Sequence, residues 1–267
     1  MRRRIVYVVL LLGLGTSGPV WAETWDDWCD HNWNRGNWEN ESFCELREFE
    51  LEAPRGTLHV DAAPNGAIRV EGWDGNGVRL IVRVTGWSRR SESVARDIVK
   101  QVEIATGGTI EVRGPHPGRN AHWSADFWLF VPNGIEMDLE SQNGGIALEN
   151  VNGALELRTV NGGISVSGVS GDIRGRTTNG GLDVELTGRR WEGEGLDLVT
   201  TNGGVDLDIP QDYNARLQTS TVNGTLRTDF PVTLRGRIDR QLHTTLGDGG
   251  PTIRARTTNG GVVLRDN

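Results

Sequence analysis

Residues 177–186 read Thr-Thr-Asn-Gly-Gly-Leu-Asp-Val-Glu-Leu, an Asn-Gly turn between a threonine pair and an alternating apolar run. Asn-Gly turns of this kind recur through the C-terminal half at spacings of 18, 18, 23, 21 and 36 residues, and 36 is twice 18. A near-constant period of this length indicates a repeat architecture. The six turns of this period begin at Asn143, Asn161, Asn179, Asn202, Asn223 and Asn259.

The residues around each turn repeat as well. A threonine, or Ser141 in the first unit, stands two positions before each asparagine, and apolar residues recur six before it and three after it. Alternation on both sides of a turn predicts two short β-strands per repeat, joined at an Asn-Gly corner. We expect Asn and Gly at this corner because they tolerate positive φ angles.

Two architectures are compatible with such units. Asn-Gly between alternating strands is a strong signal for antiparallel hairpins. A constant period instead suits a solenoid, in which each coil of the chain lies on the preceding coil and equivalent residues stack about 4.8 Å apart. Only the solenoid explains why the same residue types recur in every unit. The sequence therefore predicts a parallel β-helix-like solenoid with rungs of about 18 residues, regular over residues 133–267, whose corner asparagines form a ladder.

The region before these repeats is less regular. Alternating apolar residues predict short strands within 46–90, near 109–112 and near 126–131. Val94, Ile98 and Val102 share one face of a short helix expected within 91–104, with Ser91 or Ser93 as its N-cap. The predicted fold is all-β, with a β-rich N-terminal part and one short helix in a domain spanning residues 46–267.

The first 22 residues have the pattern of an export signal: three arginines, an apolar run over residues 5–14, and Ala22 at the end. The alternative is an uncleaved anchor, but glycines and Pro19 interrupt the run, and about 20 apolar residues are needed to span a membrane. Cleavage removes three arginines, so the net charge of the 267-residue chain changes from −8 to −11. Such an acidic protein argues against nucleic acid as a partner.

Residues 23–45 form a tryptophan-rich leader that contains the two cysteines of the chain. In an oxidising compartment, Cys29 and Cys44 are expected to form one disulfide, worth about 3 kcal/mol for a loop of this size. The alternatives are two free thiols or half of a metal site with His31. The tryptophans of this leader suit either a sugar-binding surface or a tethered N-terminal cap. They are Trp25, Trp28, Trp33 and Trp38.

Several segments together resemble the bacterial DUF4097 family of β-strand-repeat putative adhesins. They include the cysteine pair followed by residues 45–49 (Glu-Leu-Arg-Glu-Phe), Val131-Pro132 before the repeats, and the serial Thr-x-Asn-Gly-Gly units. Residues 229–232 (Asp-Phe-Pro-Val) and the closing residues 249–254 (Gly-Gly-Pro-Thr-Ile-Arg) also match. The resemblance implies an exported, right-handed β-helix-like solenoid and supplies no catalytic residues. Thr225 departs from the pattern, since it replaces the second glycine of its corner.

One loop and one acidic face are the candidate binding elements. Arg189, Arg190 and Trp191 interrupt the regular repeat, and they could contact a sugar or an anionic lipid head group; alternatively, the Trp folds back over the solenoid. The pairs Asp183/Glu185 and Asp206/Asp208 align in neighbouring repeats, where like charges repel. Ca²⁺ could relieve this repulsion, but the nonapeptide Ca²⁺ repeat is absent. The other expectation is a solvated face eased by Arg158, Arg174 and Arg176.

The remaining motifs give no support for catalysis. His116 and His122 could share a metal, but no third ligand has recognisable spacing, so no metal or cofactor is predicted. No nucleophile elbow or phosphate-binding loop is present. We therefore predict a non-enzymatic scaffold in the periplasm or on the cell surface, with an envelope polymer or a protein as its partner. The alternatives are a periplasmic component of an envelope-stress response and a carbohydrate-active β-helix enzyme.

Overall fold

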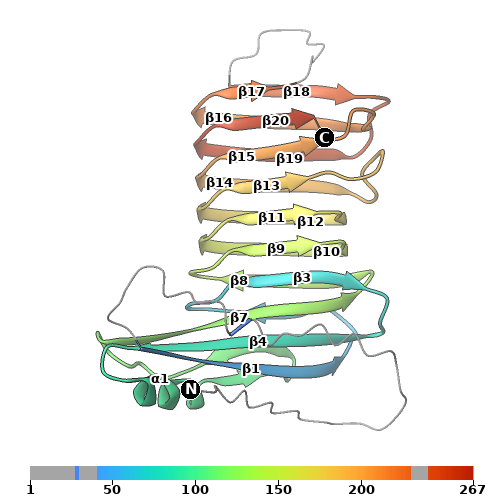
Figure 1. Ribbon diagram of the computed structural model, residues 1–267. Helices are drawn as coiled ribbons and strands as arrows, with labels where there is room; N and C mark the ends of the chain where they lie inside the picture. Colours follow the sequence, from blue (N-terminus) through green and yellow to red (C-terminus); the bar gives the residue numbers. More distant parts are fainter. Residues whose placement is uncertain (1–27, 30–40, 230–239, 267) are drawn as a thin grey trace.

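The computed structural model describes residues 28–29, 41–229 and 240–266 (Figure 1). The expected signal peptide, residues 1–22, lies outside the described residues, as does most of the expected leader. In the described part, two ten-stranded sheets face each other and one helix is present. The prediction of a nearly all-β protein with one short helix is confirmed. No helix of this part is long and apolar enough to cross a membrane.

Sheet A and sheet B are named here by their strands in spatial order. Sheet A comprises β1 (Glu41–Glu52), β4 (Gly77–Ser88), β7 (Ala121–Pro132), β3 (Ile68–Trp73), β9 (Ile146–Glu149), β11 (Ile164–Ser167), β13 (Leu182–Glu185), β15 (Val205–Ile209), β20 (Val262–Asp266) and β17 (Leu226–Thr228). Sheet B comprises β18 (Gln241–Leu246), β16 (Ala215–Asn223), β19 (Thr252–Asn259), β14 (Gly195–Asn202), β12 (Ser170–Asn179), β10 (Asn152–Asn161), β8 (Ile135–Ser141), β2 (Leu58–Asp61), β6 (Thr109–Arg113) and β5 (Glu103–Ala105).

Each rung of the stack consists of one strand from sheet B, an Asn-Gly corner and one strand from sheet A. Neighbouring rungs pair in parallel and in register, so that Leu155 lies opposite Met137 on one side and Ile173 on the other. These apolar side chains point between the two sheets, where all three are buried. The period-2 pattern of the sequence therefore builds a continuous core inside a β-solenoid, and the hairpin alternative is wrong for the repeats.

The order of the rungs differs from the order of the chain. The last rung, β19–β20, lies between β14–β15 and β16–β17, and the C-terminus therefore ends inside the stack (Figure 1). At the other end, β2–β3 lies between β8–β9 and the strands β6 and β7. The expectation that every coil lies on the preceding one is wrong for β19–β20, and β2–β3 forms a further rung outside the predicted range of residues 133–267. All rungs carry the same apolar pattern, so this pattern does not encode their order.

The corner glycines are required by close backbone packing, and the expectation of positive φ angles is wrong for them. The residues with positive φ lie elsewhere, and none is a corner Asn or Gly. A Cβ atom at Gly162 would lie 2.2 Å from the carbonyl oxygen of Gly144 in the adjacent corner, and one at Gly180 would lie 2.1 Å from that of Gly162. Each corner approaches the next so closely that only glycine fits.

Thr225 is tolerated because its corner belongs to the last strand of sheet A. A Cβ atom at the second glycine of each interior corner points to the next corner along the stack, for example from Gly163 to the oxygen of Gly181 at 3.1 Å. Thr225 precedes β17, which has no further neighbour in sheet A. This corner still follows the common geometry, since Asn223 and Thr221 keep the side-chain hydrogen bonds of the other corners.

The N-terminal end of the stack is broader. Strand β4 pairs antiparallel with β1 on one side and with β7 on the other, and helix α1 (Glu92–Lys100) packs against β4 and β1. The expected cap residue is correct, because the Ser91 side chain accepts a hydrogen bond from the amide of Val94. Arg47 of β1 donates to the carbonyl oxygens of Val99 and Val102, and these bonds tie the helix end to the sheet.

Candidate functional site: a groove on the outer face of sheet A

The corner side chains form a ladder that spans the stack. In each interior corner the asparagine Nδ2 donates to Oδ1 of the neighbouring asparagine at 2.7–3.0 Å. This asparagine ladder runs in the order Asn65, Asn143, Asn161, Asn179, Asn202, Asn259 and Asn223. The threonine two positions earlier, such as Thr177, donates to a glycine carbonyl oxygen of the neighbouring corner at 2.7 Å. These polar groups satisfy one another, so they serve the fold and leave ligand binding to other surfaces.

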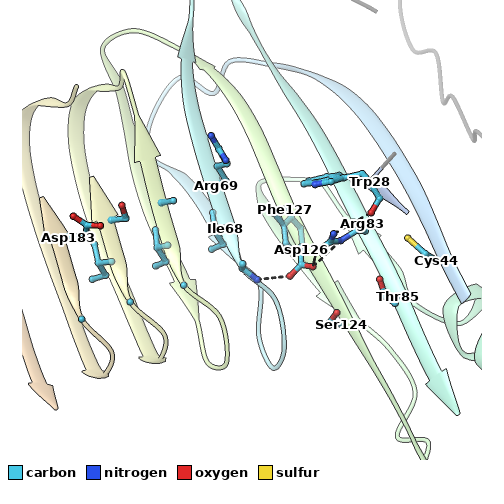
Figure 2. A pocket seen from close by; sticks show the side chains of 18 of the residues that line it. Trp28, Cys44, Ile68, Arg69, Arg83, Thr85, Ser124, Asp126, Phe127 and Asp183 are labelled. Atoms are coloured by element: carbon cyan, nitrogen blue, oxygen red, sulfur yellow. Dashed lines mark hydrogen bonds and ion pairs between the residues drawn. The ribbon is translucent and has the colours of Figure 1, made fainter. Parts of the chain in front are cut away.

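An elongated groove of about 820 Å³ crosses the outer face of sheet A beside this ladder. Residues from eight neighbouring strands line it, from β1 at one end to β15 at the other. Seven strand spacings of about 4.8 Å place its two ends about 33 Å apart. Figure 2 shows Trp28 and Cys44 at one end and Asp183 at the other.

The first end is bounded by a tryptophan that a disulfide attaches to the sheet. Cys29 is bonded to Cys44 of β1, and the preceding residue, Trp28, packs on Trp128 with ring centroids 5.1 Å apart. The Arg83 guanidinium lies 5.0 Å from the Trp28 ring and donates to Asp126 at 2.7 Å. This end therefore has an aromatic wall above a paired arginine and aspartate.

The middle of the groove is hollow because its side chains are small. The second glycines of three corners, Gly145, Gly163 and Gly181, line it in a row. The next outward positions on β9 and β11 are Ala147 and Ser165, which lie opposite each other. Arg69 of β3 is in register with Ala147, and Asp183 of β13 is in register with Ser165. Larger side chains therefore border a low floor on two sides.

The second end is acidic. Asp183 lies directly opposite Asp206 on β15, and burial together with the nearby carboxylates of Asp208 and Asp206 raises the pKa of Asp183. Arg265 of β20 neutralises part of this charge, at 2.7 Å from Asp206 and 3.6 Å from Asp208. Within the described residues, no ion pair or hydrogen bond engages the Asp183 carboxylate. Asp183 is therefore the one carboxylate of the described groove lining that makes no ion pair or hydrogen bond, although the charge of Arg265 partly offsets the rise in its pKa.

The expected relief of this acidic face by three arginines is wrong. Arg158, Arg174 and Arg176 lie on sheet B, and Arg158 is engaged there by Asp138, Glu140 and Glu156. A residue pointing outward from sheet B lies on the opposite side of the core from sheet A, so these cations cannot serve Asp183. The counter-charge comes from Arg265 in the C-terminal rung, which the order of the rungs brings beside β15.

The loop that interrupts the repeat packs its tryptophan inward. Trp191 is 3% exposed, and its Nε1 donates to the carbonyl oxygen of Gly171 at 3.0 Å. Arg189 and Arg190 remain at the exposed surface, and Arg190 pairs with Glu192 at 2.9 Å. A ligand at this loop would therefore meet the two arginines and not the aromatic face.

The two histidines of the polar loop line one hollow, and His122 has an aromatic neighbour there. His122 stacks on Trp87 with centroids 4.7 Å apart, and burial lowers its pKa. Among the described residues, no three His, Cys, Asp or Glu side chains are grouped as a metal site. Trp25, Trp33 and Trp38 of the expected leader lie outside the described residues, whereas Trp28 lines the groove.

The sequence carried signals for parts of this site that were not recognised. Asn65 belongs to the asparagine ladder, and Ile68 and Val70 occupy the same positions after it as in the other units. The walls of the groove have no local signal, because Trp28 and Trp128 meet across a hundred residues of sequence.

Comparisons with known proteins give one family and a set of similar structures. The chain resembles a putative cell adhesion protein from Clostridium sporogenes ATCC 15579 at 9% identity and a TM-score of 0.43, over 85% of this chain and 100% of that one. A putative adhesin from Bacteroides fragilis NCTC 9343 shows 13% identity and a TM-score of 0.37, over 83% and 97%. A putative lipid binding protein from Parabacteroides distasonis ATCC 8503 shows 11% identity and a TM-score of 0.38, over 86% of this chain and 98% of that one.

No curated protein matches the chain. The sequence pattern of the family described as Toastrack DUF4097 matches residues 133–265, which begin just before β8 and extend into β20. This segment contains every Asn-Gly corner of the period recognised in the sequence. Over residues 133–265, and with the stacked rungs that they form, the chain belongs to the Toastrack DUF4097 family.

Proposed function

We propose that this chain is an exported, non-enzymatic binding scaffold, an adhesin-like β-solenoid that holds an envelope polymer or a protein in the groove on sheet A. The groove carries this proposal, because it combines about 820 Å³ of open volume with aromatic, hydroxyl and charged side chains on rigid strands. The proposal includes a right-handed stack with rungs of about 18 residues and a cleaved signal over residues 1–22.

Two observations support an exported scaffold. The Cys29–Cys44 disulfide suits an oxidising compartment, either the periplasm or the cell surface. The floor of the groove is set by backbone hydrogen bonds between rungs, for example from the Ile146 amide to the Gly163 carbonyl oxygen at 3.0 Å. Such a floor is rigid and presents side chains in a fixed row, as a binding surface requires.

A pair of substitutions on β11 tests whether the groove binds. Ser165→Arg places a long side chain on the floor, whereas Ser167→Arg places the same side chain two residues further along the same face, outside the groove. The purified mature chain is incubated with isolated cell envelopes, and the bound fraction is measured by sedimentation. We expect Ser165→Arg to lose binding and Ser167→Arg to keep it. Equal binding by the two variants, or no binding by the unmodified chain, would overturn the proposal.

Cell fractionation of a tagged chain tests export. The proposal requires the mature chain in the periplasmic, outer-membrane or surface fraction, with its N-terminus after Ala22 as determined by mass spectrometry. Recovery of the full-length chain in the cytoplasm would contradict it. Release of products from an envelope polysaccharide would instead point to the enzyme alternative.

A further inference from the structure

The hydroxyl side chains of the groove differ from those of the corners. Every corner threonine donates to a backbone carbonyl oxygen, as Thr177 does to Gly162. In the groove, Ser42, Thr85, Ser124 and Ser165 make no hydrogen bond to a protein group among the described residues. These four hydroxyls can each donate and accept. They are distributed over β1, β4, β7 and β11, and so follow most of the length of the groove.

The charged groups at the floor also have capacity for a ligand. Arg69 uses only its Nη2 to contact both carboxylate oxygens of Glu149 at 2.7 Å, and its side chain is 43% exposed. Asp183, three strands away in the same register row, makes no hydrogen bond or ion pair in the described part of the chain. Between them lie Ala147 and the Ser165 hydroxyl. The row therefore offers donors at one end, a hydroxyl in the middle and an acceptor at the other end.

The backbone amides of the groove floor are not available to hydrogen-bond a ligand. The amides of Ile146, Ile164 and Leu182 donate to the carbonyl oxygens of the next corners at 2.9–3.0 Å, so they are already paired. A peptide that adds to a sheet needs unpaired backbone groups at a strand edge. The groove crosses the strands of sheet A instead of following an edge, and recognition must therefore use side chains.

From these features we infer that the groove binds a linear glycan that is uncharged or carries amino groups. This inference rests on the proposed function and narrows its ligand to one class. The hydroxyls of a sugar both donate and accept, so they match the Arg69–Ser165–Asp183 row and the hydroxyls of β1, β4 and β7. A length of about 33 Å suits a chain of several sugars. Trp28 and Trp87 line the groove, and His122 covers one face of the Trp87 ring, so its other face and the Trp28 ring would supply the aromatic contact for a sugar.

The charges of the groove exclude polyanionic glycans. Arg83 is paired with Asp126, Arg69 is paired with Glu149, and Asp206 is paired with Arg265. Within the described lining this leaves Asp183 as the one charged group outside an ion pair. A uronic acid would place a second anion beside it, whereas an amino sugar would place a cation there.

Isothermal titration with defined oligosaccharides tests the inference. The probes are oligomers of N-acetylglucosamine, the corresponding oligomers of glucosamine, and oligogalacturonate as the polyanion. We expect the first two to bind, the amine-bearing oligomer more tightly, and oligogalacturonate to give no signal. Asp183→Asn should weaken the glucosamine oligomer about tenfold, because it removes a charged hydrogen-bond acceptor. Glu185→Gln is the matched control, since it removes the same charge from the same strand outside the groove. This variant should bind the glucosamine oligomer as tightly as the unmodified chain does.

The outcomes separate this inference from the proposed function. If Ser165→Arg abolishes the envelope binding of the unmodified chain but none of the oligosaccharides binds, the groove binds another class of ligand and the glycan inference fails. The inference also fails if oligogalacturonate binds best, or if Glu185→Gln weakens binding as much as Asp183→Asn. If the envelope binding itself is absent, the proposed function fails with it.

Discussion

The Asn259 side-chain amide donates to Oδ1 of Asn202 at 2.7 Å, although 57 residues separate them. Asn223, which is nearer to Asn202 in sequence, lies on the other side of Asn259. The asparagine ladder therefore records the spatial order of the rungs and not their order in the chain. An interior member makes two ladder bonds, one as donor and one as acceptor, whereas Asn223 at the end only donates.

This difference predicts unequal losses of stability. Asn179→Ala removes two side-chain hydrogen bonds, so the free energy of unfolding should fall by about 2 kcal/mol. Asn223→Ala removes one and should cost about 1 kcal/mol. Chemical denaturation of the two variants measures both values. Equal losses would mean that the ladder bonds contribute little beyond the corner geometry.

The close approach of neighbouring corners predicts a severe effect of a single methyl group. Gly162→Ala would place a Cβ atom 2.2 Å from a backbone oxygen that cannot move without displacing its own rung. The free energy of unfolding should fall by about 3 kcal/mol. Gly56→Ala is the control, because nothing lies within 4 Å of a Cβ atom there, and its stability should change by less than about 0.5 kcal/mol. If Gly162→Ala is tolerated equally well, the corners are not packed as the structure has them.

The sequence predicts the corners well because their pattern is local. Thr177, Asn179 and Leu182 lie within six residues of one another, and each repeat specifies the same contacts with its neighbours. The repeat pattern does not identify the corner at Asn65, because Ala63 stands where the other units have serine or threonine, and Ala67 stands where most have glycine. The steric reason for the corner glycines also required the structure, since two residues in one corner do not reveal how close the next corner lies.

The groove and the rung order are not encoded locally. Rungs with equivalent apolar positions can exchange places without changing the core, so periodicity alone does not place β19–β20 between β14–β15 and β16–β17. The groove needs a tryptophan beside Cys29, a low floor at Ala147 and an acid at Asp183, which come from three different parts of the chain. No repeat pattern relates them.

The position of the last rung predicts an unusual response to truncation. Deleting residues 247–267 removes an interior rung and leaves β14 and β16 without a shared neighbour. We expect this variant to lose its cooperative unfolding transition and to become sensitive to protease over residues 205–229. Deleting residues 266–267 alone keeps most pairs of β19 and β20 and should preserve the transition. A truncated chain that remains a stable, shorter stack would show that the rungs follow the chain order.

The disulfide predicts a redox-dependent environment for Trp28. Reduction of Cys29–Cys44, or Cys29→Ser, frees Trp28 from its stack on Trp128, so its fluorescence should shift to longer wavelength. The unfolding free energy should fall by about 3 kcal/mol, the value for a loop of this size. Trp28→Phe is the control, because the spectral difference between oxidised and reduced protein should disappear in it. If the difference persists, another tryptophan reports the reduction.

The Asp183 carboxylate should lower the stability of the fold at neutral pH while it contributes to ligand binding. Burial, with the carboxylates of Asp208 and Asp206, raises its pKa, so the folded state holds this proton more tightly than the unfolded state. Stability from this group is therefore present at low pH and is lost as the pH rises through the raised pKa; above it, the ionised carboxylate destabilises the fold by a constant amount. Asp183→Asn should thus be more stable than the unmodified chain at pH 7, and the difference should shrink as the pH falls through the raised pKa towards the ordinary aspartate pKa, below which it stays constant. Thermal unfolding of the two proteins across this range measures the difference. A variant that is less stable at pH 7 would show that Asp183 has a stabilising partner, and the carboxylate would then not be free to receive a ligand.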